Sequence, residues 1–384
     1  MKEEAHRLGF DLVGACPAIA PPRLGHFQQW LADGFAGQMR FLVDRAEAYH
    51  HPGRVLNGAR SLLMLGVNYQ TIEPLAPRAG QGAISRYAWG ADYHDVIHRR
   101  LRRLVEFHRR LTPEARVRGV VDTAPLLERE FAELAGLGWV GKNTLLLDRR
   151  LGSWLFLAAL LTTEELEYDE PAGVGHCGTC RACVDACPTG ALVAPYRLDA
   201  RRCLSYLTIE LRDAVPPPLR EKLGPWLFGC DVCQEVCPWN AHARGQRSRL
   251  GDGLAPAPPR NPLELAPLFL LDDESFRRRF RRTPLWRARR GGLLRNAAIV
   301  LGNCPHGPAV PALARGLNDA EPLVRGACAW ALGRSSDPAA MAALRARQCV
   351  ETDHQVQQEL RAAMASWQAA GAGESATACP LPTR

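Results

Sequence analysis

The 384-residue sequence has no long apolar run and very little lysine. Its longest apolar stretch, residues 154–161, suits a buried strand or helix and is much too short to span a membrane. The N-terminus lacks the charged-then-apolar order of an export signal, so we expect a cytoplasmic protein that contacts no membrane. An apolar content of 47% is enough to build a sizeable core in two or three domains.

Only three of the 48 basic residues are lysines, and the rest are arginines. The formal net charge is +8. Eight arginines gather in a stretch of fourteen residues without any acid, at positions 277, 278, 279, 281, 282, 287, 289 and 290. Such a run is either a solvated face or a surface that contacts a phosphate backbone. Phe280 and Trp286 within it favour a segment that packs.

Eight of the thirteen cysteines fall into two groups with regular spacing. The first group is Cys177-x2-Cys180-x2-Cys183-x3-Cys187-Pro188, and the second is Cys203 followed by Cys230-x2-Cys233-x3-Cys237-Pro238. This spacing is typical of proteins that hold two [4Fe–4S] clusters, in which the cysteine before proline binds the other cluster. The predicted ligands are Cys177, Cys180, Cys183 and Cys237 for one cluster, and Cys187, Cys203, Cys230 and Cys233 for the other.

Two other roles for these cysteines fit less well. A disulfide framework suits a short secreted chain. Zinc also uses Cys-x2-Cys pairs, but the third cysteine at the same spacing and the proline after both runs favour iron–sulfur clusters. Such clusters transfer single electrons, so the sequence predicts a redox protein.

Three regions follow from the pattern along the chain, which predicts an α+β multidomain protein. Residues 1–165 form an α/β domain, with strands at 11–15, 61–69 and 117–122 and helices at 93–111 and 125–135. Residues 166–245 form the two-cluster module, in which prolines 216–218 break a helical insert at 204–223. Residues 246–384 contain a linker, the arginine run and HEAT-like helices opening near 294 and 324. A plain helical cap is the alternative, and we expect disorder after residue 370.

Several further segments resemble one family, the epoxyqueuosine reductases. They are ISRYA with DYH (84–88 and 92–94), VDTAPLLER (121–129), GLGWVGKN (136–143) and RCLSYLTIE (202–210). The resemblance covers roughly residues 1–335. It implies a cobalamin held between an N-terminal α/β domain and a ferredoxin-like module, with HEAT-like repeats behind them. It also implies removal of the epoxide oxygen from epoxyqueuosine at the wobble position of tRNA, which yields queuosine and water and takes two electrons and two protons.

The departing oxygen needs a proton donor. Asp122 ends a predicted strand and matches the family's proton-donating aspartate, and burial beside the corrin would raise its pKa. From the residues alone, Asp122 also suits an N-cap for the helix near residue 125. The resemblance places the following residues around the cobalamin: Arg45, Ser85, Asp122, Leu146, Leu157, Ser205, Cys230 and Asp231.

The cobalamin is expected in a base-off form without a histidine ligand. The sequence Asp92-Tyr93-His94-Asp95-Val96-Ile97 comes nearest to the Asp-x-His-x-x-Gly pattern of histidine-ligated cobalamin proteins, but it lacks the glycine. The resemblance implies the same, and loss of an axial donor makes the reduced cobalt state easier to reach.

The expected macromolecular partner is the anticodon stem–loop of tRNA, together with an unidentified reductant. We expect a monomer. The predicted tRNA contacts are Ile209, Glu210, Arg212, Arg287, Arg289, Arg290, Arg295 and Asn296. Two rival functions are a reductive dehalogenase-like corrinoid enzyme and a ferredoxin-type electron-transfer subunit. The first usually carries a twin-arginine signal and lacks HEAT-like repeats, and the second leaves residues 1–165 without a purpose.

Overall fold

The computed structural model of the protein describes residues 1–173, 175–255, 261–305 and 307–370. The chain divides into two compact units, each built from three separate segments. Unit 1 contains Met1–Ile72, Gly90–Cys203 and Asp231–Pro256, and unit 2 contains Glu73–Trp89, Leu204–Cys230 and Ala257–Arg384. The predicted division into three consecutive domains stays a prediction, and the tail predicted to be disordered lies outside the described residues.

Unit 1 is built on a four-stranded antiparallel sheet with the strand order β1-β2-β7-β4. The bounds are β1 Leu12–Pro17, β2 Ser61–Asn68, β4 Val117–Val120 and β7 Leu155–Thr162. All eight residues of β2 are buried, because this strand lies inside the sheet and both its faces are covered. The three strands predicted in this part of the sequence are confirmed as β1, β2 and β4, with small shifts at their ends.

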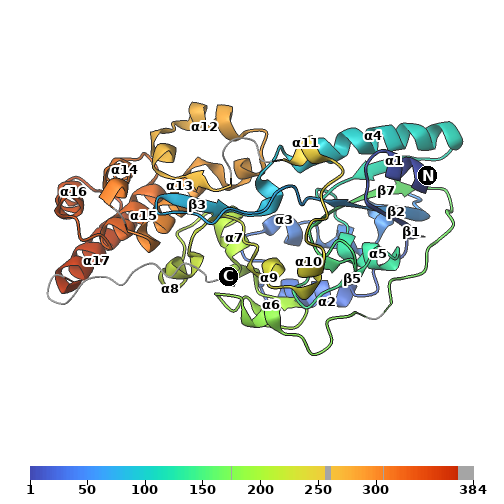
Figure 1. Cartoon of the computed structure of the whole chain (residues 1–384), viewed down its shortest axis with the longest axis horizontal. Coiled ribbons are helices and arrows are strands. Elements are labelled where there is room, and N and C mark those ends of the chain that lie inside the picture. The colour runs from blue at the N-terminus through green and yellow to red at the C-terminus, as the bar shows by residue number, and fades with distance from the viewer. Residues whose placement is uncertain (174, 256–260, 306, 371–384) are drawn as a thin grey trace. The chain divides into compact units, whose positions relative to one another are not determined.

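Two helices cover opposite faces of this sheet (Figure 1). Helix α4, Tyr93–Leu111, has the bounds predicted for it, and α5 spans Glu128–Leu134. Met64 and Val120 pack with Phe131 of α5 in one core cluster. Gly119, which points to the other face of β4, has room for no large side chain because a Cβ there would lie 3.2 Å from Leu101 of α4.

Short elements complete unit 1. The helices are α1 Lys2–Arg7, α2 Leu24–Ala32, α3 Arg40–Val43, α6 Ala182–Asp185, α9 Val232–Glu235, α10 Pro238–His242 and α11 Gly251–Leu254. The 3-10 helices are η1 Ala46–His50, η2 Pro52–Arg54 and η4 Ala200–Arg202. Two small hairpins pair β5 Trp139–Val140 with β6 Leu146–Leu147, and β8 Leu192–Ala194 with β9 Arg197–Leu198.

Unit 2 joins strands that lie far apart in the sequence. Its three-stranded sheet has the order β10-β3-β11, with β3 Gln81–Ile84, β10 Trp226–Phe228 and β11 Leu263–Glu264. A Cβ at Gly82 would lie 2.8 Å from the Cβ of Leu227 and 2.9 Å from Leu265, so only glycine lets these segments approach. The predicted insert at 204–223 is divided by its prolines into α7 Leu204–Ile209, α8 Pro217–Arg220 and η5 Glu221–Leu223.

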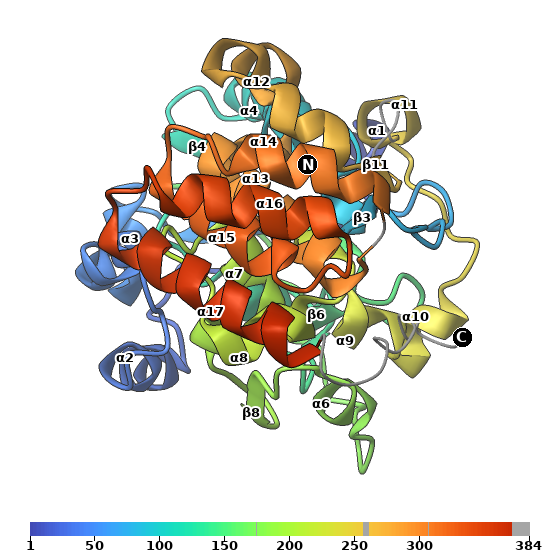
Figure 2. The ribbon, with the colours of Figure 1, turned by 90° about the vertical axis from the view of Figure 1, so that its left-hand side faces the viewer.

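The rest of unit 2 is helical (Figure 2). Helices α13, α15 and α17 pack in succession, while α14 contacts α15 and α16. The helices are α12 Asp273–Phe280, α13 Arg289–Asn303, α14 Val310–Gly316, α15 Pro322–Leu332, α16 Pro338–Gln348 and α17 His354–Ala370. The 3-10 helices are η3 Arg86–Ala88, η6 Ala266–Leu270, η7 Pro284–Ala288 and η8 Gly307–Ala309. The helix predicted to open near residue 294 begins at Arg289, so that prediction is wrong by more than one turn.

In the described part of the chain, no helix is both long and apolar enough to cross a bilayer.

Candidate active site

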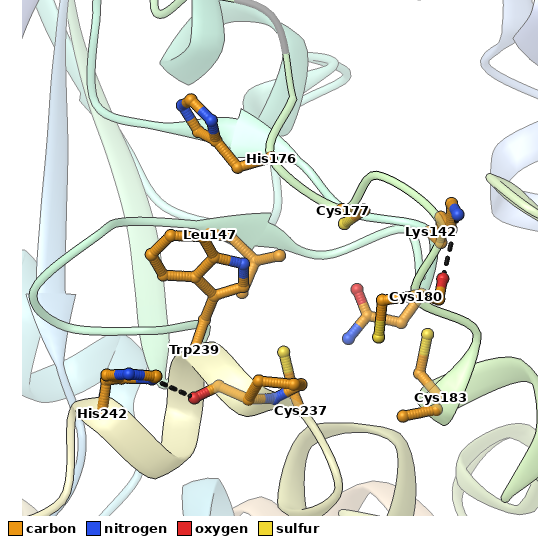
Figure 3. A pocket seen from close by; sticks show the side chains of 12 residues that line it. Lys142, Leu147, His176, Cys177, Cys180, Cys183, Cys237, Trp239 and His242 are labelled. Atoms are coloured by element: carbon orange, nitrogen blue, oxygen red, sulfur yellow. Dashed lines mark hydrogen bonds between the residues drawn. The ribbon is translucent and has the colours of Figure 1, made fainter.

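Four cysteines surround a hollow of about 320 Å³ in unit 1 (Figure 3). They are Cys177, Cys180, Cys183 and Cys237. The first three lie on α6 and the loop before it, and the fourth directly precedes α10. Burial raises the pKa of Cys183, and the neighbouring thiols of Cys237, Cys177 and Cys180 raise it further. The structure therefore brings together the four residues predicted to bind one cluster, including the distant Cys237.

The spacing of these sulfurs suits a cluster better than a single metal ion. Within residues 1–173, 175–255, 261–305 and 307–370, no three His, Cys, Asp or Glu side chains converge on one ion position. Zinc requires four ligands within about 2.3 Å of one point, whereas a [4Fe–4S] cluster takes one thiolate on each of four irons. The sulfurs line the walls of a hollow instead, as ligands of a cluster do.

The walls of the hollow include an amide, a lysine and one tryptophan, Trp239, and Trp139 packs against this tryptophan. Trp139 and Trp239 meet edge to face, with ring centroids 5.0 Å apart. Lys142 donates hydrogen bonds to the carbonyl oxygens of Gly178 (2.6 Å) and Cys180 (2.9 Å), so it holds the cysteine loop in place. Asn143 lines the hollow, and its buried Nδ2 finds no hydrogen-bond partner among the described residues. A cluster sulfur would give this donor an acceptor.

A second group of cysteines lies beside the first. Burial raises the pKa of Cys233, and the nearby charges of Cys203 and Cys187 contribute in the same direction. Cys187 lies in a different environment: although it is partly buried, hydrogen bonds from Thr189 and from the Ala191 N–H lower its pKa. Cys230, the remaining predicted ligand, belongs to unit 2, so its place in the second cluster stays a prediction.

Asp122 follows β4 and has a left-handed backbone, with a φ of 54°. Aspartate adopts this conformation more easily than most residues, yet it carries strain, and such strain gathers at functional sites. The side chain is 59% exposed. The carboxyl group of Asp122 is therefore not buried by the protein itself. The predicted burial requires bound molecules that cover this group.

Three residues hold the carboxyl group and backbone of Asp122. Tyr93, at the start of α4, donates a short hydrogen bond from Oη to Oδ2 of Asp122. His94 places Nε2 3.5 Å from the same oxygen, while its Nδ1 lies 2.7 Å from Oδ1 of Asp92. The backbone N–H of Asp122 donates to Oε1 of Glu128 at 2.9 Å. The carboxyl group is thus fixed from α4, and its turn is fixed from α5.

Both ionisable neighbours keep a proton at neutral pH. Burial opposes the charge on His94, but its hydrogen bonds to Asp122 and Asp92 outweigh burial and raise its pKa to about 9. Burial raises the pKa of Glu128 to about 8, and the negative charge of Asp122 adds to the effect. The alternative role for Asp122, as the N-cap of a helix near residue 125, is wrong: α5 begins at Glu128, and Leu127 precedes it without a side-chain cap.

The residues predicted to surround cobalamin belong to both units. In unit 1, Arg45 is exposed and donates to the Thr123 carbonyl oxygen at 3.0 Å, next to Asp122. Leu146 and Asp231 are buried, and Leu157 is partly exposed on β7. In unit 2, Ser85 is buried and Ser205 is partly exposed on α7, and Cys230 is also assigned to this unit.

Most of the arginines predicted to bind tRNA are engaged within unit 2. Arg287 forms two hydrogen bonds with Glu210, at 2.8 and 2.9 Å. Arg290 is only 10% exposed and pairs with Asp319 and Asp273. Further predicted contacts in this unit are Ile209, which is partly buried, Arg212, whose guanidinium binds backbone carbonyl oxygens, and Arg289, which is exposed.

The predicted tRNA contacts of Arg295 and Asn296 do not fit the structure. Arg295 is 1% exposed and donates to the carbonyl oxygens of Leu207, Leu211 and Asp213. Asn296 is fully buried and donates to two further backbone carbonyl oxygens. Both side chains satisfy backbone groups around α7 and leave nothing for a phosphate. The polarity of these two residues indicated a binding surface, but both side chains form hydrogen bonds inside unit 2.

Three family models match the chain. One, described as "Epoxyqueuosine reductase QueG, DUF1730", matches residues 50–123. The "4Fe-4S double cluster binding domain" matches 176–240, and "HEAT repeats" match 289–365.

Full-length relatives decide the family. The epoxyqueuosine reductase of Pseudomonas aeruginosa is 40% identical over 345 residues, which cover 88% of this chain and 94% of the relative. That of Gloeobacter violaceus is 41% identical over 315 residues, covering 79% and 95%. The chain belongs to the epoxyqueuosine reductase family. It is therefore an oxidoreductase by family, and the predicted two-cluster module and HEAT-like repeats are confirmed at this level.

Solved structures of the family have the same fold. An epoxyqueuosine reductase crystallised with a tRNA-Tyr epoxyqueuosine-modified stem loop is 30% identical, with a TM-score of 0.88 and coverage of 96% of this chain and 97% of that one. The enzyme from Streptococcus thermophilus is 29% identical, with a TM-score of 0.84 and coverage of 96% and 98%.

Sequence reasoning did not connect Asp122 with three residues that the structure places around it. Tyr93, His94 and Glu128 all lie in segments that carried the family resemblance, and that was the one available indication. Nothing in the spacing showed that residues 93–94 and 122–128 would meet, because two different helices bring them together.

Proposed function

We propose that this epoxyqueuosine reductase removes the epoxide oxygen from epoxyqueuosine at the wobble position of tRNA and releases queuosine and water. The reaction consumes two electrons and two protons: the two carbon–oxygen bonds break, a carbon–carbon double bond forms, and the oxygen leaves as water. The observation that carries the proposal is the presence, in one unit, of a cysteine-lined hollow and of Asp122, whose backbone is left-handed and whose neighbours His94 and Glu128 are protonated.

The electrons require two [4Fe–4S] clusters and a cobalamin. When bound, the clusters supply single electrons, and reduced cobalamin supplies a strong reductant and nucleophile. Cys177, Cys180, Cys183 and Cys237 would hold the first cluster, and Cys187, Cys203, Cys230 and Cys233 the second. The hollow and the unpartnered Nδ2 of Asn143 fit the first cluster.

The surroundings of Asp122 fit an apolar, ring-shaped cofactor. Leu155 and Leu157 are partly exposed on one face of β7, while Phe156 between them is buried on the other. Because β4 ends opposite Ala159, the chain that continues to Asp122 runs alongside this apolar strip. A corrin would cover the strip and shield the Asp122 carboxyl group from water, with Arg45 and Leu146 close by in the same unit. Ser85, Ser205, Cys230 and Asp231 are the other proposed cobalamin contacts.

Asp122 is the proposed proton donor to the departing oxygen. A covered carboxyl group keeps its proton more readily, since burial disfavours the charged form. Tyr93 fixes the orientation of this group, and the Nε2 of His94 lies 3.5 Å from Oδ2 of Asp122. Once Asp122 has given up its proton, its negative charge helps to keep His94 protonated, and His94 can supply the next proton. Because both ring nitrogens of His94 face carboxylates, this histidine is not available as a cobalt ligand, which supports a base-off cofactor without histidine.

The substrate proposed is the anticodon stem–loop of tRNA, with the exposed Arg289 and the Glu210-bound Arg287 among its contacts. Bases of such loops can be unstacked and inserted into a pocket. An unidentified reductant, a cytoplasmic location and a monomeric state complete the proposal. The two rival functions are a dehalogenase-like corrinoid enzyme and a simple electron carrier. Neither explains why the chain belongs to the epoxyqueuosine reductase family.

The test is anaerobic incubation of the cluster-loaded and cobalamin-loaded protein with a chemical reductant and an epoxyqueuosine-containing stem–loop. Digestion to nucleosides and mass spectrometry should show epoxyqueuosine replaced by queuosine, with the loss of one oxygen atom. Unchanged epoxyqueuosine, with about eight irons and one corrinoid per chain, would show that the proposed function is wrong.

A further inference from the structure

Helix α4 carries a dense row of arginines that the proposed reaction does not use. Arg99, Arg102, Arg103 and Arg109, here called the α4 basic face, are all exposed. They recur at spacings of three and four residues or of seven, so they lie on one side of the helix. Ile97, Leu101 and Leu104 on the other side are buried. The helix is thus anchored in unit 1 by its apolar side and presents a positive surface to solvent.

The arginines of the α4 basic face form no ion pair with any described residue. This contrasts with other helical arginines of the chain: Arg7 pairs with Glu4, and Arg278 pairs with Glu274, each one turn away. On α4, Asp95 lies one turn before Arg99, and Glu106 lies one turn from Arg102, Arg103 and Arg109, yet neither acid forms an ion pair with them among the described residues. Arg99 also has two arginines, Arg102 and Arg103, one turn away. Like charges one turn apart destabilise a helix by a few tenths of a kcal/mol per pair. The Arg99–Arg102 and Arg99–Arg103 pairs therefore cost stability in the free protein.

The helix dipole accounts for only part of this charge. Basic residues in a last turn are stabilising, which explains Arg109 near the C-terminus of α4. Arg99, Arg102 and Arg103 lie in the middle turns, where the dipole gives no such benefit. Their mutual repulsion is visible at Arg100, whose pKa is lowered by burial and then by the charges of Arg99 and Arg103.

A hollow of about 370 Å³ opens beside this face, between α4 and β4. Arg102, Arg109 and His98 line it, and Glu106 is its one acidic lining residue. Guanidinium groups around a concave surface bind phosphate oxygens well, since each offers several N–H donors in one plane. The hollow gives the α4 basic face the shape, as well as the charge, of a phosphate-binding surface.

The position of α4 relates this face to the reacting base. Tyr93 and His94 in the first turn contact Asp122, and the helix then extends for nineteen residues, about 28 Å at 1.5 Å per residue. If the base of a nucleotide reaches Asp122, the RNA strand that carries this base begins its path along the protein at the N-terminal end of α4. The helix runs from there within unit 1, past Arg99 and Arg102, to Arg109.

We propose that the α4 basic face binds the phosphate backbone of the tRNA stem next to the anticodon loop, an assignment that rests on the proposed function. The contact is with phosphates and not with base edges, so it should be independent of sequence and sensitive to salt.

The test measures binding of a fluorescent anticodon stem–loop to the loaded protein across a range of salt concentrations. The variant Arg99→Ala/Arg102→Ala/Arg103→Ala should raise Kd about tenfold and lessen the salt slope by about two to three, because each of the three lost phosphate contacts removes about 0.7 to 0.9 of slope. Alanine keeps the helix intact, and iron content and circular dichroism verify the fold. Glu106→Gln should act in the opposite direction and tighten binding, since it removes the acid from the hollow.

The matched control is Arg315→Ala/Arg345→Ala/Arg361→Ala, which removes the same charge from exposed positions on α14, α16 and α17. It should bind RNA nearly as the unmodified protein does. If both triple variants weaken RNA binding equally, the effect comes from the net charge of the protein and not from the α4 basic face, and the proposal is overturned. Unchanged RNA affinity of the α4 variant would also overturn the proposal. This holds even if the variant slows reduction of the clusters by an acidic protein donor, because the face would then bind that donor and not RNA.

Failure of this proposal is distinct from failure of the proposed function. The binding assay uses an unmodified stem–loop as well as one with epoxyqueuosine, and the α4 variant should weaken both by the same factor. Conversion of epoxyqueuosine by the unmodified protein, measured separately, decides the reaction. If that conversion fails while the α4 variant still weakens RNA binding, the surface assignment stands and the reaction assignment falls.

Discussion

The cysteine-lined hollow and the Asp122 site lie in the same unit but follow opposite designs. The hollow is assembled from segments distant in sequence, 142–147, 176–183 and 237–242, and its lining includes Trp239 and aliphatic side chains. The Asp122 site comes from residues 92–94 and 122–128, is polar, and leaves the carboxyl group 59% exposed. Groups that hold electrons benefit from exclusion of water. A proton donor has to recover its proton after each turnover, and the polar side chains around Asp122 allow this.

The difference also decides what the sequence reveals. Cluster ligands need a fixed residue type at a fixed spacing, so they can be recognised in a sequence of any origin. A general acid needs only one carboxyl group in the right surroundings, and those surroundings are made by tertiary structure. Changes in the two sites should therefore have separable effects on electrons and on protons.

The largest effect is expected from removal of a cluster ligand. Cys180→Ala takes one thiolate from the hollow, so iron should fall from about eight to about four atoms per chain and turnover should be lost. Cys349→Ala, at an exposed cysteine outside both groups, is the control and should keep its iron. Iron analysis of anaerobically purified protein makes the measurement. Full iron content in Cys180→Ala would contradict the ligand assignment.

Replacement of the acid comes next in size. Asp122→Asn keeps the shape of the side chain but removes its proton, so turnover should fall by about 10² to 10⁴ while iron and corrinoid content stay unchanged. Glu114→Gln, an exposed carboxyl group elsewhere in unit 1, should behave as the unmodified protein. Single-turnover nucleoside analysis separates them, and near-normal turnover in Asp122→Asn would exclude it as the donor.

A smaller effect, with a defined pH dependence, is expected at His94. Its pKa of about 9 in the folded protein lies above the ordinary value of 6.5. The stabilisation is complete below pH 6.5 and declines as the pH rises through about 9, because only the folded state holds the proton in that window. The unfolding temperature of the unmodified protein should therefore exceed that of His94→Gln at pH 6, and the gap should close by pH 10. A difference in unfolding temperature that stays constant with pH would contradict a protonated His94 in the folded protein.

The turnover of the same variant gives a second readout. Protonated His94 resupplies Asp122 in the proposal, so the activity of the unmodified protein should decline as the pH rises through about 9. In His94→Gln this decline should be absent and the plateau lower. An unchanged profile would reduce His94 to a structural role.

The smallest expected change is in the potential of one cluster. Asn143→Leu removes the buried amide donor that lines the hollow, and loss of a hydrogen bond to a cluster sulfur lowers the reduction potential. Iron content and turnover with a strong reductant should change little. A redox titration followed by EPR makes the measurement, and an unaltered potential would show that this amide does not face the cluster.

Much of the fold could be predicted where local pattern decides it. Helix α4 has the bounds expected from its periodicity, because a single amphipathic helix with Asp92 as N-cap needs little from the rest of the chain. Strand β3 was not expected, since its partners β10 and β11 lie more than a hundred residues away. Helix α5 starts three residues later than expected, after the turn that gives Asp122 its left-handed backbone.

The charged residues show the limit of sequence reasoning most clearly. A run of arginines looks the same in a sequence whether its members face solvent or acids. Arg290 and Arg295 belong to the interior of unit 2 because Asp319 and three backbone carbonyl oxygens meet them there. Arg99 and Arg102 on α4 lack such partners among the described residues, and only the tertiary structure distinguishes these cases.

The most direct test of the account loads electrons into Asp122→Asn and follows both halves of the reaction in one sample. Reduced, corrinoid-loaded protein is mixed with epoxyqueuosine stem–loop, cluster spectra are recorded by EPR, and the nucleosides are then analysed. The account predicts clusters that reduce as in the unmodified protein together with almost no queuosine. Queuosine formed at the normal rate, or clusters that fail to reduce, would contradict a reaction in which electrons and protons come from separate sites.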